Sequence, residues 1–170
     1  MPSYCDLSAP MTDKSIFTDV YFCATSTVIT GGDNYSEEVT KTDAVTGEVR
    51  TGRKSVNRTS VGKHNSFLYF RADRDNVDEN VREVTIIVDY YDEGEENVTL
   101  QYNAEDGTGS KSMTAFKTTG TNTWKTAVIQ LTDAKFVGPD TLTGCDFRFT
   151  GGHNGEICIS KVAVLPTENY

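Results

Sequence analysis

Alternating polar and apolar residues predict a β-strand over residues 83–94, the clearest element in the chain. Its alternate apolar positions are Val84, Ile86, Val88 and Tyr90, and the run ends in the turn residues Asp92, Glu93 and Gly94. The positions between them are mixed in character, which is typical of a strand buried on one face and partly covered on the other. We expect Val84, Ile86 and Val88 to anchor the core of a central strand, and Tyr91 to be exposed enough to contact a ligand.

The same alternation predicts further short strands, which are separated by glycine-rich or acidic turns. They cover residues 16–28, 54–59, 66–72, 98–102, 111–118, 124–131, 145–150 and 157–164. Their predicted core positions are Leu68, Phe70, Ala72, Val98, Leu100, Tyr102, Ala127, Ile129 and Leu131. Residues 35–52 are expected to form a loose hairpin or a long surface loop, and residues 132–136 a short helical turn.

Because short strands follow one another without a long segment of helical period, the chain is predicted to be an all-β, antiparallel two-sheet β-sandwich. A jelly roll is favoured over an immunoglobulin topology. The 170 residues suffice for one domain with its own core, and no internal repeat or low-complexity linker divides them. We therefore expect a single domain over residues 1–170, with an irregular lead-in at residues 1–15 and a polar tail at residues 166–170.

The chain is acidic, with 16 lysine and arginine residues, 25 aspartate and glutamate residues and a formal net charge of -9. This balance disfavours nucleic acid and anionic membrane surfaces as partners, and it fits neutral ligands or bound cations. No apolar run reaches the roughly 18 to 20 residues of a membrane span, and the N-terminus lacks the basic and apolar regions of a signal peptide. If the protein is secreted, its signal has been removed or belongs to a longer parent chain.

The four cysteines include no C-x-x-C pair, and the two histidines are not at zinc-site spacing. A symmetric hairpin around residues 151–152 would place Cys145 opposite Cys158, but strand alternation turns the two thiols to opposite faces. Buried free thiols are therefore the favoured interpretation for this pair. A bond between Cys5 and Cys23 stays open in an oxidising compartment.

Several segments in the second two-thirds of the chain together carry a family resemblance. They are residues 67–70 with Asp73, residues 89–94, residues 123–136, residues 146–149 and residues 159–162. In this order they resemble the galactose-binding-like jelly-roll modules that are attached to secreted bacterial glycan-degrading enzymes. The resemblance implies a non-catalytic carbohydrate-binding module, secreted or at the cell surface and part of a larger multimodular protein. Such a module holds a polysaccharide or oligosaccharide near an enzyme or a cell surface.

Sugar binding in a β-sandwich needs aromatic faces for the apolar side of a pyranose ring, beside planar polar groups for its hydroxyls. The candidate ligand-binding residues of these types at predicted outward strand positions are Tyr69, Arg71, Tyr91, Gln101 and Arg148. The single tryptophan, Trp124, is a candidate platform too, although its place at a strand start favours a packing role. His64, Asn65, His153 and Asn154 lie in predicted loops at strand ends, where ordinary loop positions are favoured over a binding cleft.

Two acidic clusters in predicted loops supply oxygen atoms of the kind that calcium prefers. One contains the candidate metal ligands Asp73, Asp75 and Asp78, and the other spans residues 92–96. Neither has EF-hand spacing, so solvated acidic loops are favoured. No cofactor is required by this interpretation, and a structural calcium ion is the candidate exception.

The sequence therefore predicts a carbohydrate-binding protein that is not an enzyme, since it contains no G-x-S-x-G, P-loop or HExxH motif. An alternative is a small β-sandwich polysaccharide lyase acting on a uronate-containing glycan, with His64, Tyr69 and Arg148 as candidate catalytic groups. A structural surface or adhesion domain is a third hypothesis, favoured if the N-terminal region binds a protein partner.

Overall fold

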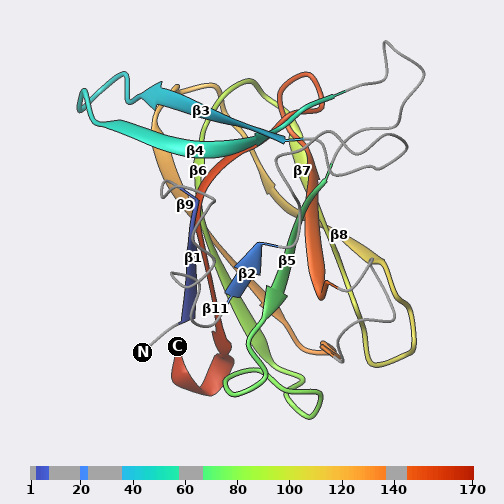
Figure 1. Ribbon diagram of the computed structural model, residues 1–170. Helices are drawn as coiled ribbons and strands as arrows, with labels where there is room; N and C mark the ends of the chain where they lie inside the picture. The colour runs from blue at the N-terminus through green and yellow to red at the C-terminus, as the bar shows by residue number, and fades with distance from the viewer. Residues whose placement is uncertain (1–2, 8–19, 23–35, 58–66, 137–144) are drawn as a thin grey trace.

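Strands form most of the described residues, as the alternation predicts (Figure 1). The computed structural model describes residues 3–7, 20–22, 36–57, 67–136 and 145–170. Sheet A is antiparallel and runs in the order β3 (Ser36–Thr42), β4 (Val49–Ser55), β11 (Cys158–Pro166), β6 (Val84–Tyr91) and β9 (Trp124–Leu131). Sheet B runs in the order β2 (Val20–Phe22), β5 (Leu68–Ala72), β10 (Phe147–Gly151), β7 (Asn97–Tyr102) and β8 (Lys111–Lys117).

The strands from β4 through β11 pair as if one long hairpin had been folded over on itself. β4 pairs with β11, β5 with β10, β6 with β9 and β7 with β8, so the pairs are nested from the ends of this segment inwards. Successive strands cross between the two sheets except at the β7–β8 turn. This nested pairing is the jelly-roll topology, so the predicted fold class is confirmed.

The N-terminal segment is more regular than predicted. Residues 3–6 form β1 (Ser3–Asp6), which pairs antiparallel with β11, and Leu7 donates a backbone hydrogen bond to Ser160 (2.8 Å). An irregular lead-in is therefore wrong for these residues, because the edge of β11 beyond β4 accepts a further strand. Residues 8–15 lie outside the described part of the chain. At the other end, the predicted tail contains a 3-10 turn at Thr167–Asn169.

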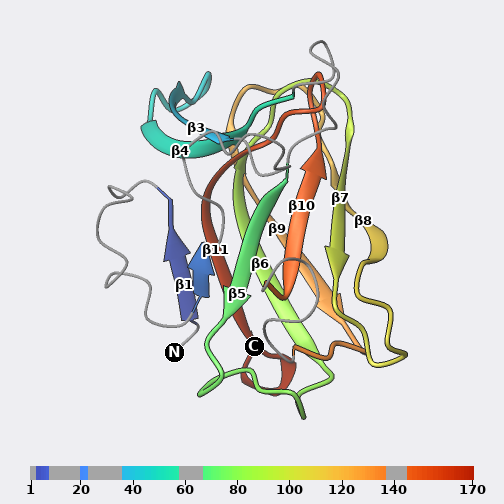
Figure 2. The same cartoon turned by 45° about the vertical axis from the view of Figure 1, so that its right-hand side comes forward.

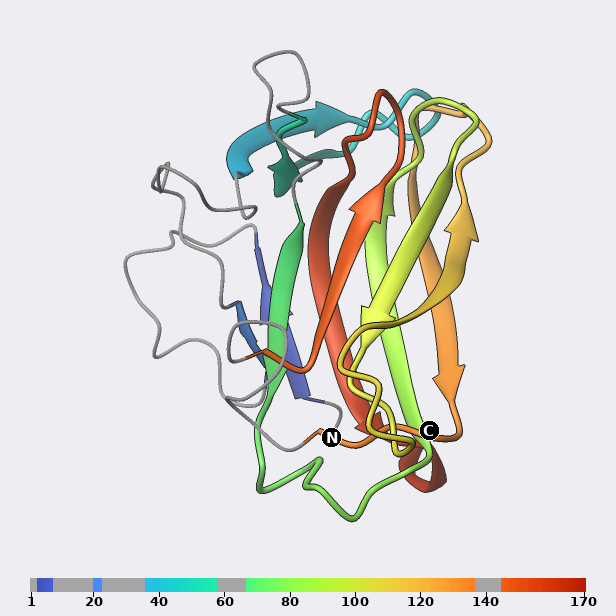
Figure 3. The ribbon, with the colours of Figure 1, turned by 90° about the vertical axis from the view of Figure 1, so that its right-hand side faces the viewer.

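Residues 36–55 form a regular hairpin rather than a loose loop, with register pairs from Ser36–Ser55 to Thr42–Val49. The observed strand β4 covers Val49–Ser55, so it begins and ends earlier in the chain than the strand predicted at residues 54–59. The β3–β4 hairpin crosses one end of the sandwich, where the β6–β7, β8–β9 and β10–β11 loops also lie (Figure 3). We call this end the rim, and the C-terminus lies at the opposite end (Figure 2).

The core between the sheets contains the predicted inward positions. The fully or almost fully buried ones are Leu68, Phe70, Ala72, Val84, Ile86, Val88, Val98, Leu100, Tyr102, Ile129 and Leu131. Ala127 packs against them from a partly buried position. β6 lies between β11 and β9, so its predicted central place is confirmed. Alternation succeeds here because every second side chain of a strand lies on the same face.

Two local predictions are wrong. Residues 132–136 form no helical turn; instead, Ala134 makes an antiparallel bridge with Ala104, and both side chains are buried. Cys145 is disulfide-bonded rather than free, whereas Cys158 is a buried free thiol. The two cysteines thus do not bond to each other, as alternation predicted. Alternation constrains the face that a thiol occupies, but not which other segment reaches it.

Candidate functional site

The residues predicted to bind a ligand do not converge on one groove. Tyr69, Arg71, Gln101 and Arg148 lie on sheet B, whereas Tyr91 and Trp124 lie at the rim beside the β3–β4 hairpin. The two groups have different surroundings and differ in what they can bind.

The first group forms a row of side chains across sheet B. Arg148 is opposite Tyr69 on β5 and opposite Gln101 on β7, and Gln101 is opposite Ser112 on β8. Arg148 donates from Nη1 to the Tyr69 hydroxyl (2.7 Å) and from Nε to Gln101 Oε1 (2.6 Å). Gln101 Nε2 donates in turn to Ser112 Oγ (3.0 Å). We call these four residues the sheet B row.

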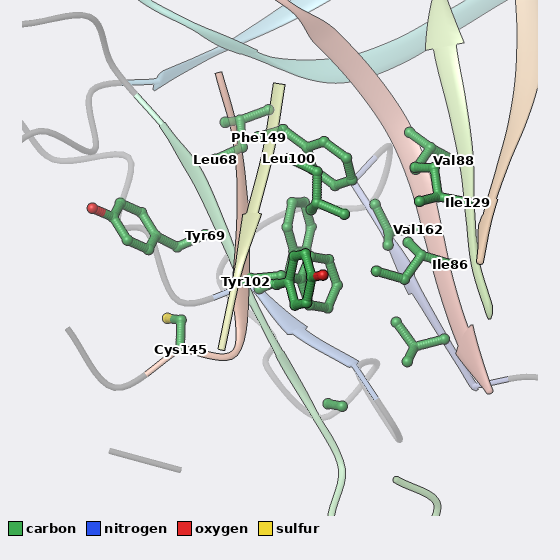
Figure 4. Close-up of a cluster of buried hydrophobic side chains, with 14 of the residues drawn as sticks. Leu68, Tyr69, Ile86, Val88, Leu100, Tyr102, Ile129, Cys145, Phe149 and Val162 are labelled. Atoms are coloured by element: carbon green, nitrogen blue, oxygen red, sulfur yellow. The ribbon is translucent and has the colours of Figure 1, made fainter. Parts of the chain in front are cut away.

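The polar groups of the sheet B row are occupied with one another. The Arg148 guanidinium also lies 3.8 Å from the ring centroid of Phe67. Tyr69 projects away from sheet A (Figure 4), yet only 2 % of it is exposed. Its predicted availability to a ligand is therefore wrong, because alternation sets the direction of a side chain and not what covers it. Arg71 is exposed on the same strand.

The second group attaches the β3–β4 hairpin to sheet A. Tyr91 and Trp124 are opposite each other in register, and their ring centroids lie 5.3 Å apart in an edge-to-face arrangement. Lys41 Nζ lies 5.3 Å from the ring centroid of Tyr91, and the Arg50 guanidinium lies 5.4 Å from that of Trp124. Lys41 and Arg50 are themselves opposite each other in the hairpin. Two cation–π contacts thus join one strand pair to the other, and we call these four side chains the aromatic clamp.

The aromatic clamp covers Tyr91. Its hydroxyl donates to the carbonyl oxygen of Thr42 (3.1 Å), and only 8 % of the residue is exposed. Trp124 donates from Nε1 to the carbonyl oxygen of Lys41 (3.4 Å). The prediction of an exposed Tyr91 is therefore wrong, because a hairpin from an earlier part of the chain lies against it. Trp124 has the packing contacts that its place at a strand start favoured.

Asp43 ties the turn of the hairpin to β9. One carboxylate oxygen accepts hydrogen bonds from the backbone N–H groups of Val45 (2.9 Å) and Thr46 (2.8 Å), and the other accepts one from Trp124 (2.9 Å). The bonds from Thr46 and Trp124 lower the pKa of Asp43 to about 2. The ionised carboxylate thus helps to fix the hairpin at the rim.

A second carboxylate shapes the β8–β9 loop. Asp92 is fully buried and accepts hydrogen bonds from the backbone and hydroxyl groups of Thr119 and Thr121, at 2.5 to 3.1 Å. Lys125 Nζ lies 2.8 Å from the same carboxylate. Burial raises the pKa of Asp92, but the bonds from Lys125, Thr121 and Thr119 outweigh it and hold the pKa well below its usual range. This carboxylate is part of the frame rather than a free acid.

A hollow of about 200 Å³ lies at the rim beside the aromatic clamp. Its walls come from the β3–β4 hairpin, the end of β6 and the β10–β11 loop, which meet at the top of Figure 1. The side chains that line it include Lys41, Lys54, Tyr91, Glu93, His153 and Glu156. We call this hollow the rim pocket.

Lysine–glutamate pairs flank the rim pocket. Lys41 Nζ lies 3.1 Å from Glu93 Oε2, and Lys54 Nζ lies 3.4 Å from Glu156 Oε1 and 3.2 Å from Glu37 Oε1. Burial lowers the pKa of Lys54, but its hydrogen bond with Glu37 and the charge of Glu156 outweigh this effect, so the pKa is raised. The pocket therefore presents ammonium donors and carboxylate acceptors side by side.

The β10–β11 loop forms one wall of the rim pocket. The His153 ring packs against Gly94, whose φ is +71° and where an added Cβ would collide with the imidazole. Asn57 Nδ2 donates to the carbonyl oxygen of Asn154 (2.7 Å) and so holds the loop. Burial raises the pKa of the Cys158 thiol to about 12, so this thiol is neutral near pH 7 and is not an activated nucleophile.

The acidic residues predicted to bind calcium take part in turns. Asp73 Oδ1 accepts a hydrogen bond from the backbone N–H of Asp75 (2.8 Å), and Asp78 Oδ1 accepts one from Asn80 (2.7 Å). Within the ranges that the structure describes, no group of three or more His, Cys, Asp or Glu side chains is placed to hold a metal ion. A calcium site at Asp73, Asp75 and Asp78 stays a prediction.

Sequence reasoning named Tyr91 and His153 but missed Lys41, Lys54 and Glu156. Their pairing joins segments about a hundred residues apart, since Lys54 and Glu156 differ by 102 positions. The sequence predicts a loose hairpin or a long surface loop at residues 35–52, but it carries no signal for where a hairpin there would dock.

By fold and site, the protein is a jelly-roll β-sandwich with a polar pocket at its rim. No protein-family model and no curated protein matches the chain. The solved structures similar to it include an exo-beta-agarase, with a TM-score of 0.48, 10 % sequence identity and coverage of 97 % of this chain and 26 % of that chain. This chain thus spans about a quarter of the agarase chain, and the similarity assigns neither family nor ligand. Among the described residues, no helix has the length and apolar character needed to cross a membrane.

Proposed function

We propose that the protein is a non-catalytic carbohydrate-binding module that binds a glycan in the rim pocket. The observation that carries this proposal is the convergence of ammonium, carboxylate and imidazole groups from three segments on one hollow beside the Tyr91 ring. Sugar hydroxyls donate and accept hydrogen bonds, so they can pair with lysine donors and glutamate acceptors at the same time. Asp43 and Asp92 hold the surrounding loops in place, which reduces the entropy cost of binding.

The charged groups of the pocket suit binding rather than hydrolysis. A glycosidase uses one carboxyl group that stays protonated, together with a second carboxylate that acts as nucleophile or base. Glu93 and Glu156 are each ion-paired with a lysine, and among the described residues neither is set opposite a second carboxyl group in the arrangement that a glycosidase uses. Binding of this kind needs no cofactor.

Secretion or display at a cell surface, as part of a larger multimodular protein, accompanies this proposal. Cys145 is disulfide-bonded, and disulfides persist in oxidising compartments. A structural calcium ion at Asp73, Asp75 and Asp78 is a separate proposal. Added calcium should then raise the melting temperature, and an unchanged melting temperature would count against it.

Isothermal titration calorimetry against plant, microbial and host polysaccharides tests the binding proposal. We expect at least one glycan to bind, and Glu93→Gln and Lys54→Met to weaken that binding. Glu105→Gln is the matched control, because Glu105 pairs with Arg82 (3.1 Å) outside the rim pocket. If no glycan binds the wild-type protein, the proposal is wrong.

A polysaccharide lyase acting on a uronate-containing glycan is the second candidate, favoured by the 2.7 Å contact between the Tyr69 hydroxyl and Arg148 Nη1. A lyase needs a base and a cation that neutralises the uronate. The burial of Tyr69 makes this candidate weaker, and His64 lies outside the described residues. Ultraviolet absorbance from unsaturated products on alginate, pectin or glucuronan would favour the lyase, and no absorbance change would count against it.

A further inference from the structure

The rim pocket is small and lies beside the β3–β4 hairpin. Its volume of about 200 Å³ lies below the range of about 300 to 1,000 Å³ that is usual for drug-sized ligands. The hairpin packs directly on β11, since a Cβ added at Gly52 would lie 2.7 Å from the carbonyl oxygen of Ile159 and 3.1 Å from Cys158 Sγ. On another side, the His153 ring packs against Gly94. β4 and β11 are paired strands here, so no glycan chain passes between them, and a hollow of this volume suits a single ring.

Among the described residues that line the pocket, both lysines are paired with carboxylates. Lys41 is paired with Glu93, and Lys54 is paired with both Glu37 and Glu156. Carboxylates therefore outnumber ammonium groups here, on a chain whose net charge is -9. A uronate or a sulfate would meet more negative than positive charge, whereas a neutral hydroxylated ring would not.

Each lysine–glutamate pair matches two neighbouring hydroxyl groups. Lys41 Nζ and Glu93 Oε2 lie 3.1 Å apart, so two adjacent hydroxyls of one ring can reach both. One hydroxyl accepts from the ammonium group while the other donates to the carboxylate. An ammonium group has three N–H donors, so Lys41 keeps donors after it pairs with Glu93. Lys54 pairs with both Glu37 and Glu156 and so keeps one of its three donors, while Glu156 accepts a hydrogen bond from the backbone N–H of Asn57 at Oε2 (3.1 Å) and offers Oε1 beside Lys54.

We propose that the rim pocket binds the terminal residue of a neutral glycan, with vicinal hydroxyls bound by the Lys41–Glu93 and Lys54–Glu156 pairs. This inference rests on the proposed carbohydrate-binding function and adds the position and charge of the residue that is bound. Most of the affinity then comes from one ring at the chain end, so further residues add little. A carboxylate on that ring opposes binding.

Calorimetry with oligosaccharides of increasing length tests the chain-end proposal. The probes are xylo-, manno-, gluco- and galacto-oligosaccharides, with the methyl glycosides of the same sugars, of glucuronate and of galacturonate. We expect the Kd of the best methyl glycoside to lie within about threefold of the Kd of its longest oligosaccharide. The methyl glycosides of glucuronate and galacturonate should each bind at least about tenfold more weakly than that glycoside. Affinity that rises about tenfold or more with length would overturn the chain-end proposal. Equal binding of a uronate would overturn the neutral specificity.

Glu93→Gln and Glu156→Gln test the hydroxyl pairing. Each change replaces a charge-assisted hydrogen bond, so we expect about a tenfold or greater loss of affinity for the neutral glycoside and weaker discrimination against the uronate. Glu105→Gln should bind as the wild type does, and circular dichroism checks that each variant is folded. If both pocket variants bind normally, the rim pocket is not the site, while a carbohydrate-binding function elsewhere still stands. If no probe binds the wild-type protein but a polysaccharide of the wider panel does, the chain-end proposal alone fails. If neither binds, the proposed function itself fails.

Discussion

The sheet B row and the rim pocket contain similar polar groups but use them in opposite ways. In the row, Arg148 donates to Tyr69 and Gln101 on adjacent strands. At the rim, the Lys41–Glu93 and Lys54–Glu156 pairs border a hollow of about 200 Å³. The row pairs its polar groups with one another across neighbouring strands, whereas the pairs at the rim border a space that a ligand can fill.

The difference shows that the right residue types at outward strand positions are not enough for a binding site. Within a sheet, register holds opposite Cβ atoms about 4.5 to 5.5 Å apart, so long polar side chains meet and pair. The walls of the rim pocket come from the β3–β4 hairpin, the end of β6 and the β10–β11 loop. These segments are not all paired as neighbouring strands, and a hollow remains between them. A binding site is therefore more readily built at the ends of strands than across their faces.

The largest loss of stability is expected when the buried carboxylate of Asp92, which holds the β8–β9 loop at the rim, is removed. Asp92→Ala leaves the donors of Thr119, Thr121 and Lys125 without their shared acceptor. We expect a loss of about 3 kcal/mol in the free energy of unfolding, measured by urea denaturation, because a buried ion pair loses one partner. Glycan affinity should fall as well, because Asp92 immediately precedes Glu93.

Asp106→Ala is the control for this change. Asp106 accepts a hydrogen bond from the backbone N–H of Thr108 (2.9 Å) in the loop between β7 and β8, and this loop lies at the other end of the sandwich from the rim (Figure 3). It should cost much less stability than Asp92→Ala and leave glycan affinity unchanged. Equal effects of the two variants would mean that the rim does not depend on the buried carboxylate.

The core faces of the strands could be predicted because alternation is a local property. Leu100 and Tyr102 on β7, and Ile86 and Val88 on β6, lie in the core whichever strands are their neighbours. The same property indicated the direction of Tyr69 but not its burial, which depends on what lies over the sheet. A pattern within one strand contains no information on that cover.

The rim could not be predicted, because its contacts join distant parts of the chain. Asp43 contacts Trp124 across 81 positions, and the Tyr91 hydroxyl contacts Thr42 across 49. Nothing within residues 35–52 specifies where the hairpin docks. The sequence therefore could not predict the aromatic clamp or the burial of Tyr91, since both depend on where the hairpin docks.

A smaller effect, on stability alone, is expected in the sheet B row. Arg148→Met keeps most of the side-chain stem but removes the guanidinium group, with its hydrogen bonds to Tyr69 and Gln101 and its contact with Phe67. We expect a loss of about 2 kcal/mol in urea denaturation and unchanged glycan affinity. Arg71→Met is the control, because Arg71 is exposed on the same strand as Tyr69. It should change neither the free energy of unfolding nor the glycan affinity. Loss of glycan binding in Arg148→Met would reverse the comparison and identify the sheet B row as the site.

The smallest effect is expected from pH on the link between the hairpin and sheet A. Bonds from Thr46 and Trp124 lower the pKa of Asp43 in the folded protein to about 2, from a reference value of 3.8. The stabilisation is complete above about pH 4; between there and about pH 2 the unfolded state binds more protons, so stability falls as pH falls. The variant Asp43→Asn has no carboxylate to protonate, so it does not lose stability in this way.

Differential scanning calorimetry measures the difference in melting temperature between wild type and Asp43→Asn. This difference should narrow as the pH falls from about 4 to about 2. A constant difference would mean that the charge of Asp43 does not hold the hairpin, and that the aromatic clamp docks it alone.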